Sequence, residues 1–383
     1  MPDPTLDPLV ALRRQLHEHA ELSGNEAATA EIVARHLAAR EPDDMATGVG
    51  GHGVLAAWSG PAPGPTVLFR CELDALPIPE GNKRVSHRCG HDGHMAIVAG
   101  MADRLRARRP ASGRVVLAFQ PAEETGAGAA RLLAAPEFAR FRPDLAFALH
   151  NLPGQALGHV ILREGTFASA SVGLRLILTG RSAHAGEPHK GHSPALAMAR
   201  IVEDLSRWID PQWRPGTLIT VVGARLGRGA FGTSPDDAEV SATLRAWTDQ
   251  DLAALVAQAR ERCARIAQEH AEPLRSEPLR SELVEPFPAT VNDGRCAAYV
   301  RDAAARAGLT VEALPHAHAW SEDFGHFASI CPIALFGLGA GLQQPALHDP
   351  DHEFPDTIIA PGLAVFSEIT DGVLGGSGGA QGG

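Results

Sequence analysis

Apolar residues in the first 150 positions follow two different periods. At 9–20 and around 32–38 they recur every three to four residues, and this spacing predicts two amphipathic helices, the second capped by Ser-Gly-Asn-Glu at 23–26. Runs of consecutive apolar residues between turns are typical of buried parallel strands. These runs lie at 54–58, 66–70, 115–119 and 145–149. With a helix from His94, they predict an α/β domain whose mixed, mostly parallel sheet is flanked by helices.

The pattern changes from about residue 171. Alternating or short apolar runs at 174–178, 218–222 and 238–244 predict strands of a smaller sheet, and 193–208 and 249–270 have helical spacing. Two β-α-β passages of this kind predict an inserted α+β domain of the ferredoxin-like type. Helix at 293–307, strand at 333–336 and a last helix from Pro361 then complete the first domain.

The chain of 383 residues is longer than a single hydrophobic core usually supports, which favours two domains. We expect a catalytic domain from 1–170 and 285–374, an inserted domain at 171–284, and a flexible Gly-rich tail at 375–383. A tandem Glu-Pro-Leu-Arg-Ser within 272–283 is too short for an architectural repeat and predicts a variable edge strand or a hinge.

Charge and cysteine content narrow the class of protein. The formal net charge of −11, without a long Lys/Arg run, argues against nucleic acid or an anionic membrane as a partner. Five widely spaced cysteines do not form a disulfide framework. The acidic N-terminus lacks the apolar core of a signal peptide, and we find no 18-residue apolar run. We therefore expect a cytoplasmic protein.

The densest candidate chemistry is His-Arg-Cys-Gly-His-Asp-Gly-His at 87–94. Cys89 and His91 are two residues apart, so one metal centre can reach both, and Gly90 and Gly93 relax the local backbone limits. The helix that follows favours a thiolate at its N-terminus. The alternative is a histidine-rich loop with a buried free cysteine.

Polar side chains follow three of the predicted strands. Glu72 and Asp74 follow the first, Glu123 and Glu124 the second, and His150 the third. Ligands of open α/β sheets bind at such strand ends. Adjacent residues point in different directions, so Glu124 can bind metal while Glu123 faces a water; the alternative is an acidic solvated turn.

Seven motifs, in chain order, resemble those of the M20 metallopeptidase family, which holds aminoacylases and glutamate carboxypeptidases. They lie at 70–77, 89–94, 119–124, 149–151, 180–186, 321–324 and 347–348. The chain is most similar to the amidohydrolase subfamily of hippurate hydrolases and N-acyl-amino-acid deacylases. The resemblance covers almost the whole chain, and Cys-Gly-His-Asp-Gly-His is its most specific motif.

The resemblance implies two divalent ions per chain, Zn²⁺ or Mn²⁺, with Co²⁺ and Ni²⁺ as further options. The ligands carried over by motif are Cys89, His91, Glu124, His150 and His348. A thiolate can bridge two metals about 3.5–4 Å apart. His352 is an alternative to His348 as the last ligand. His348 could also be a surface histidine that binds no metal. Asp74 matches a position that orients a metal ligand.

The resemblance also assigns residues of the inserted domain. His184 matches a histidine that in dimers reaches the partner's active site and stabilises the oxyanion, so we expect a homodimer or higher homo-oligomer. Arg245 matches a substrate-binding arginine, and His189 is a weaker substrate contact. Relatives commonly carry Asn where Gly232 stands, so either a backbone N–H replaces the Asn side chain or the substrate differs from a plain N-acyl amino acid.

Two further departures concern the pocket rim. Relatives usually have Asp in place of Glu72, and the loop at 79–87 is shorter than usual.

The function implied is hydrolysis of N-acyl amino acids or related small amides. The metal pair lowers the pKa of water, Glu123 acts as general base, and the metal with His184 stabilises the oxyanion. The alternatives are a dipeptidase or carboxypeptidase on the same scaffold, or a non-catalytic small-molecule binder.

Overall fold

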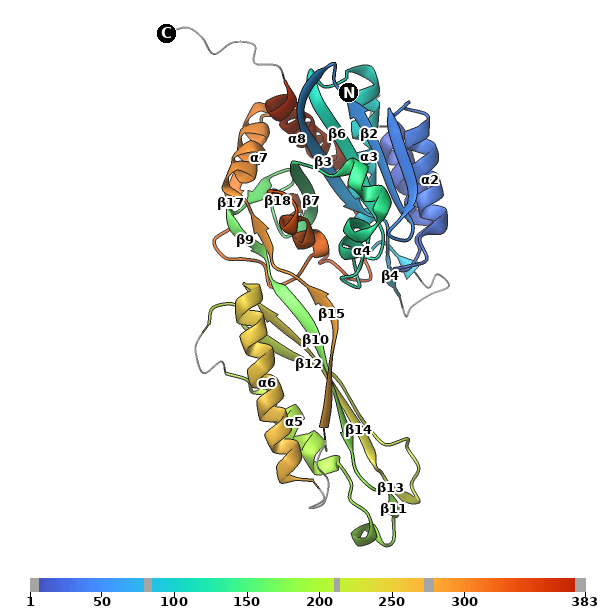
Figure 1. The fold of residues 1–383 in the computed structure, drawn as a ribbon, viewed down its shortest axis with the longest axis vertical. Helices are drawn as coiled ribbons and strands as arrows, with labels where there is room; N and C mark the ends of the chain where they lie inside the picture. Colours follow the sequence, from blue (N-terminus) through green and yellow to red (C-terminus); the bar gives the residue numbers. More distant parts are fainter. Residues whose placement is uncertain (1–6, 79–84, 210–213, 272–278, 376–383) are drawn as a thin grey trace. The chain divides into compact units, whose positions relative to one another are not determined.

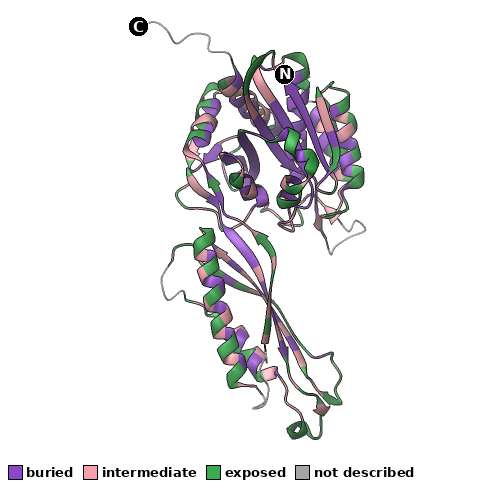
Figure 2. Ribbon diagram, viewed as in Figure 1, coloured by how far each residue is buried: buried purple, intermediate pink, exposed green. Residues whose placement is uncertain are grey.

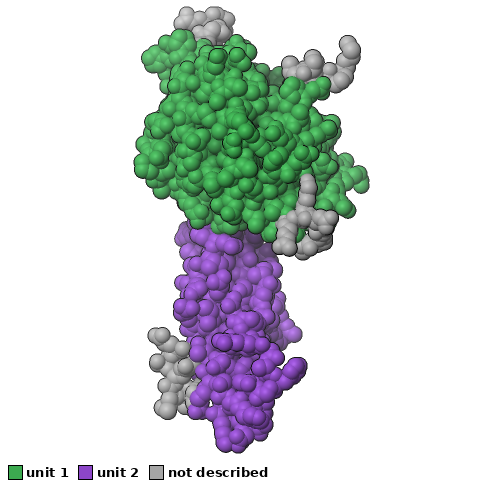
Figure 3. Space-filling view, turned by 90° about the vertical axis from the view of Figure 1, so that its right-hand side faces the viewer, with its two compact units in different colours: residues 1–167, 290–316, 323–383 green, residues 168–289, 317–322 purple. Residues whose placement is uncertain are grey.

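The computed structural model describes residues 7–78, 85–209, 214–271 and 279–375 and divides into two compact units (Figure 1, Figure 3). Unit 1 comprises residues 1–167, 290–316 and 323–383, and unit 2 comprises 168–289 and 317–322. The sequence predicted an inserted domain at 171–284; in the structure 317–322 also clusters with unit 2. Three predicted segments lie mostly outside the described residues. They are the short loop at 79–87, the first part of the tandem repeat at 272–283 and the tail at 375–383.

Unit 1 is built on a mixed eight-stranded sheet with the order β1-β2-β6-β3-β7-β18-β8-β17. Strands β6, β3, β7 and β18 are parallel neighbours, whereas β1, β2 and β8 add antiparallel pairs. The mostly parallel centre was predicted. The strands are β1 Asp44–Val49, β2 Gly53–Ser59, β3 Ala62–Glu72, β6 Ser112–Gln120, β7 Leu145–Pro153, β8 Val160–Leu162, β17 Val311–Ala313 and β18 Ile333–Gly341.

Helices cover this sheet and bury its apolar side chains (Figure 2). Helices α3 and α8 pack on β3, and α1 and α7 pack on these helices in turn. Phe69 and Phe366 have ring centroids 4.6 Å apart in the core. The helices of unit 1 are α1 Asp7–Glu18, α2 Ala27–Ala38, α3 His91–Ala107, α4 Gly128–Ala134, α7 Gly294–Arg306 and α8 Ile359–Leu374, with 3-10 turns η1 Pro136–Phe141, η3 Asp323–Ser329 and η4 Asp356–Ile358.

One described segment, Asp356–Leu374, has the length and apolar composition of a membrane span. It comprises η4 and α8. Ile359, Val365, Phe366 and Ile369 are fully buried in the core of unit 1. These contacts make α8 a core helix.

Unit 2 has the β-α-β-β-α-β order predicted for a ferredoxin-like domain. Its antiparallel sheet has the order β12-β14-β10-β15, which leaves β12 and β15 at the edges. The apolar side chains of α5 and α6 pack with the inward-facing residues of β10 and β14. The elements are β10 Ala170–Thr179, β11 Ala183–His184, η2 Pro188–Lys190, α5 Ala195–Ser206, β12 Leu218–Leu226, β13 Thr233–Ser234, β14 Asp237–Ala246, α6 Asp249–Glu269 and β15 Leu279–Phe287.

Two short pairings complete the chain, β4 with β5 and β9 with β16. Their bounds are β4 Leu76–Pro77, β5 Val85–Ser86, β9 Gly165–Ala168 and β16 Thr290–Asn292.

Candidate metal centre

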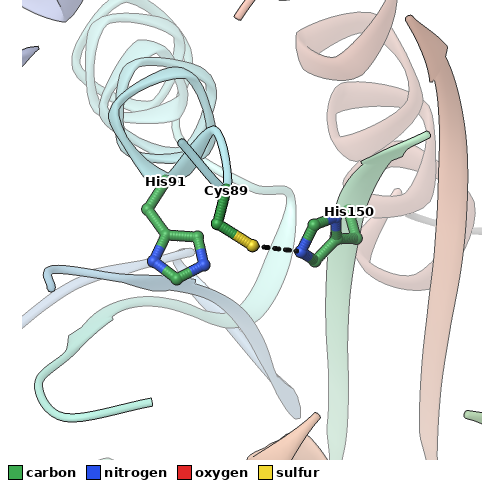
Figure 4. Close-up of side chains that lie close together, drawn as sticks. All are labelled: Cys89, His91 and His150. Carbon is green, nitrogen blue, oxygen red and sulfur yellow. Dashed lines mark hydrogen bonds between the residues drawn. The ribbon is translucent and has the colours of Figure 1, made fainter. Parts of the chain in front are cut away.

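Three buried side chains from two segments converge at the carboxyl end of the unit 1 sheet. Cys89 and His91 lie at the start of α3, and His150 lies in β7, with all three side chains turned toward one another (Figure 4). Cys89 Sγ is 3.5 Å from His150 Nε2. Gly90 makes the turn between Cys89 and His91 with φ of 91°, and an added Cβ would lie 2.5 Å from Asn151 Oδ1. The motif therefore requires glycine here.

The two imidazoles are held by their Nδ1 atoms. His91 Nδ1 lies 2.9 Å from the Asp74 carbonyl oxygen, and His150 Nδ1 lies 2.9 Å from the Asn151 carbonyl oxygen. Since a carbonyl oxygen only accepts, each Nδ1 donates, and in the neutral ring this leaves the lone pair on Nε2. Burial holds the pKa of His150 well below its ordinary value, so its imidazole is neutral near pH 7. A neutral imidazole with a fixed tautomer is a ready metal ligand.

The side chains of Glu123 and Glu124, which follow β6, both lie beside His91. His91, Glu123 and Glu124 each offer an atom within 4.8 Å of the others. His91 Nε2 lies 3.9 Å from Glu124 Oε1, whereas Glu123 Oε1 lies 3.4 Å from the backbone nitrogen of Asp323. The two neighbouring carboxylates thus point in different directions.

The Asp74 carboxylate faces this turn more than it faces His91. Its Oδ2 accepts hydrogen bonds from the Glu124 backbone nitrogen at 3.0 Å and from Ser23 Oγ at 2.6 Å. Its Oδ1 lies 3.9 Å from His91 Nδ1. In this structure Asp74 orients the imidazole through its backbone carbonyl.

His348 joins the centre from the other end of the chain. Its backbone N–H donates to the Arg88 carbonyl at 2.9 Å, and its φ is 69°, which is rare outside glycine. It forms a third group of candidate ligands with Cys89 and Glu124. The rival, His352, instead has Nδ1 2.9 Å from the Pro345 carbonyl and Nε2 3.3 Å from Asn151 Nδ2.

The donor set fits two divalent ions. One thiol, three imidazoles and the carboxylate of Glu124 are the ligand types that Zn²⁺ and Mn²⁺ accept. The groups overlap, because Cys89 belongs with His91 and His150 and also with Glu124 and His348. Cys89 is therefore positioned between two adjacent ligand groups, where a bridging thiolate would lie.

Sequence reasoning missed a buried charge network beside this centre. The Arg70 guanidinium donates to Glu72, Asp323 and Gln120, and the other carboxylate oxygen of Glu72 lies 2.7 Å from His94 Nδ1. Arg70 and Glu72 are two residues apart in β3, so the strand period places them on one face, which was the available signal. The network holds the carboxyl end of β3, which Asp74 follows closely in the chain.

His17 takes part in a second ionic cluster. Its Nδ1 lies 2.9 Å from Asp92 Oδ2, and Arg13 Nη1 lies 3.1 Å from the same oxygen. Burial opposes ionisation of Asp92, but His17, His87 and Arg13 outweigh it and lower its pKa to about 2. This ionic cluster ties α1 to the first turn of α3.

Of the predicted residues of unit 2, His184, His189 and Gly232 lie in neighbouring segments, because β11 pairs with β13 and contacts η2, whereas Arg245 lies near the carboxyl end of β14. His184 and His189 are exposed, and Gly186 N–H donates to His184 Nδ1 at 3.0 Å. Arg245 Nη1 donates to Ser321 Oγ and to the Ala319 carbonyl, at 2.9 and 3.1 Å. No described atom outside its chain neighbours lies within 4 Å of a Cβ built on Gly232, so the surroundings do not require glycine there.

Comparison with known proteins identifies the family of this chain. The model of peptidase family M20/M25/M40 matches residues 68–371. N-acetyl-L-cysteine deacetylase of Bacillus subtilis is 29% identical over 92% of this chain and 84% of its own, and N-acetyldiaminopimelate deacetylase of Enterococcus faecalis is 29% identical over 94% and 96%. A dinuclear metal-binding M20 peptidase of Bacillus subtilis shares the fold, with a TM-score of 0.80 and 24% identity over 98% of this chain and 99% of its own. As its motifs predicted, the chain belongs to the peptidase family M20/M25/M40, a family of metal-dependent hydrolases.

Proposed function

We propose that this enzyme hydrolyses the amide bond of N-acyl amino acids, with Cys89, His91, Glu124, His150 and His348 holding two divalent ions, Zn²⁺ or Mn²⁺. The observation that carries the proposal is the convergence of these five side chains, from four separate segments, beside a further carboxylate. Two relatives named as deacetylases of N-acetylated amino acids support the substrate class.

The proposed reaction uses Glu123 as the proton carrier. Two ions bound at the centre would lower the pKa of water and polarise the amide carbonyl. Glu123 is buried and stands beside the ligands, so its carboxylate takes a proton from the attacking water and delivers it to the leaving amine. The Asp323 backbone N–H holds the carboxylate in this orientation.

We extend the proposal to a homodimer in which His184 of a second copy stabilises the oxyanion and Arg245 and His189 contact substrate. Edge strand β12 supports self-association, because its exposed side chains include Leu218, Val222 and Leu226. The free, buried cysteines suit a reducing cytoplasm as the location. Sedimentation showing a fully active monomer would contradict a histidine supplied by the partner.

The substrate class is tested with metal-reconstituted protein. A panel pairs each N-acetyl amino acid with the dipeptide that has a free α-amine, and chromatography quantifies the released amino acid. Hydrolysis of the acylated members alone supports the proposal. Preference for the free-amine members would make the protein a dipeptidase.

A further inference from the structure

Glu26 is a buried acid that takes no chemical step in the proposed reaction. Its side chain is fully buried, and within the described ranges it forms no ion pair. It precedes α2 but makes no cap bond to that helix, contrary to expectation. A buried carboxyl group without an opposite charge beside it is costly to ionise, and burial raises the pKa of Glu26 accordingly. A stabilising helix cap therefore does not account for this residue.

The contacts of Glu26 lead to the catalytic turn. Oε1 accepts hydrogen bonds from the backbone nitrogen of Gly24 at 2.7 Å and from that of Ala122 at 2.8 Å. Ala122 immediately precedes Glu123 and has a φ of 53°. A left-handed conformation at alanine costs about 1–2 kcal/mol and persists only where the surroundings hold it. The Ala122 carbonyl accepts from the Gly128 backbone nitrogen at 3.1 Å, so both polar groups of this residue are fixed.

A second carboxylate acts on the other side of Glu123. Asp74 Oδ2 accepts the backbone N–H of Glu124 at 3.0 Å. The same loop contacts both acids, since Ser23 Oγ donates to Asp74 and Gly24 N–H donates to Glu26. The backbone N–H groups of the residues before and after Glu123 are thus each held by a buried carboxyl group.

We propose that Glu26 is a positioning residue that fixes the left-handed turn at Ala122 and so aims Glu123 at the reacting water and Glu124 at the metal. This assignment rests on the roles of Glu123 and Glu124 in the proposed function. The hydrogen-bond acceptor is what matters, because both contacts of Glu26 are to backbone N–H groups.

The test compares Glu26→Ala and Glu26→Gln with Glu21→Ala as the matched control. Glu21 braces the same loop through Thr29, with Oε2 accepting from the backbone nitrogen at 2.8 Å, and has no contact with the catalytic turn among its described bonds. We expect Glu26→Ala to lower kcat by about 10- to 100-fold with little change in KM, the cost of a misplaced catalytic group. Glu26→Gln retains an acceptor oxygen and should recover most of kcat, and Glu21→Ala should keep the wild-type kcat.

Hydrogen exchange of a peptide covering 121–128 supplies a readout without turnover. Exchange should be faster in Glu26→Ala than in Glu21→Ala and the wild type. Equal exchange, or a folded Glu26→Ala with wild-type kcat, would overturn the proposal, as would Glu26→Gln no more active than Glu26→Ala. If the wild type cleaves no N-acyl amino acid, the proposed substrate fails, and exchange at 121–128 still decides the role of Glu26.

Discussion

Replacing Glu123 by Gln separates proton transfer from metal binding. The side chain is 5% exposed, and its Oε1 accepts a long hydrogen bond of 3.4 Å from the Asp323 backbone nitrogen. The glutamine amide has the same shape, and its oxygen can accept the same N–H. We therefore expect Glu123→Gln to fold, retain both ions and bind substrate, but to lose the group that accepts a proton.

The size of the loss follows from that single missing function. A positioned general base contributes about 10²–10⁴ in rate, which corresponds to about 3–5 kcal/mol in the activation barrier. Glu124→Gln removes instead a carboxylate that lies 3.9 Å from His91 Nε2 and within reach of Cys89 and His348. This variant should lose metal together with rate, and added metal should partly restore its activity.

The assay measures kcat, KM and bound metal for both variants after identical treatment with a weak chelator. Both should be nearly inactive, with about two ions per chain in Glu123→Gln and fewer in Glu124→Gln. Wild-type turnover in Glu123→Gln, or metal loss equal to that of Glu124→Gln, would show that another group is the base.

Three further changes test other parts of the structure. Cys89→Ala should lower occupancy of both metal sites in elemental analysis, because Cys89 belongs to both ligand groups; loss of only one ion would contradict a bridge. Arg70→Leu should lower the free energy of unfolding by about 3–5 kcal/mol in urea titration, since Glu72 and Asp323 would stay buried without their cation; an unchanged midpoint would contradict this. Burial lowers the pKa of His318 to about 4, so its neutral form favours folding and stability should fall as pH drops from about 6.5 to 4. Across that range His318→Gln should gain up to about 3 kcal/mol relative to the wild type, and a constant difference would refute the shift.

Elements with continuous apolar runs could be predicted, because burial on both faces leaves a local signal. β3, β6 and β7 were found this way, each longer than its apolar run. The start of α3 was placed at His94, but the helix begins at His91. Its first residues are polar yet fully buried, and they face the metal centre and the Arg13 cluster, so hydrophobic periodicity does not mark them.

Contacts between distant residues could not be predicted. The sequence shows that Arg70 and Glu26 carry charge but not that they meet Asp323 or Ala122, because no local period relates those positions. The choice between His348 and His352 likewise depends on a left-handed backbone and a hydrogen bond to Arg88. Motif resemblance supplied the ligand set, and the roles of these residues stay predictions.

The central position of β18 delays completion of the sheet while the chain is being synthesised. β18 lies between β7 and β8, yet it follows β7 by roughly 180 residues in the sequence. At about 5–20 residues per second, the ribosome leaves the edge of β7 unpaired for about 10–40 s. An unpaired edge of this kind is a template for wrong pairing. The nascent chain is therefore most prone to aggregate between the emergence of β7 and that of β18, and slower translation of that interval lengthens the exposure.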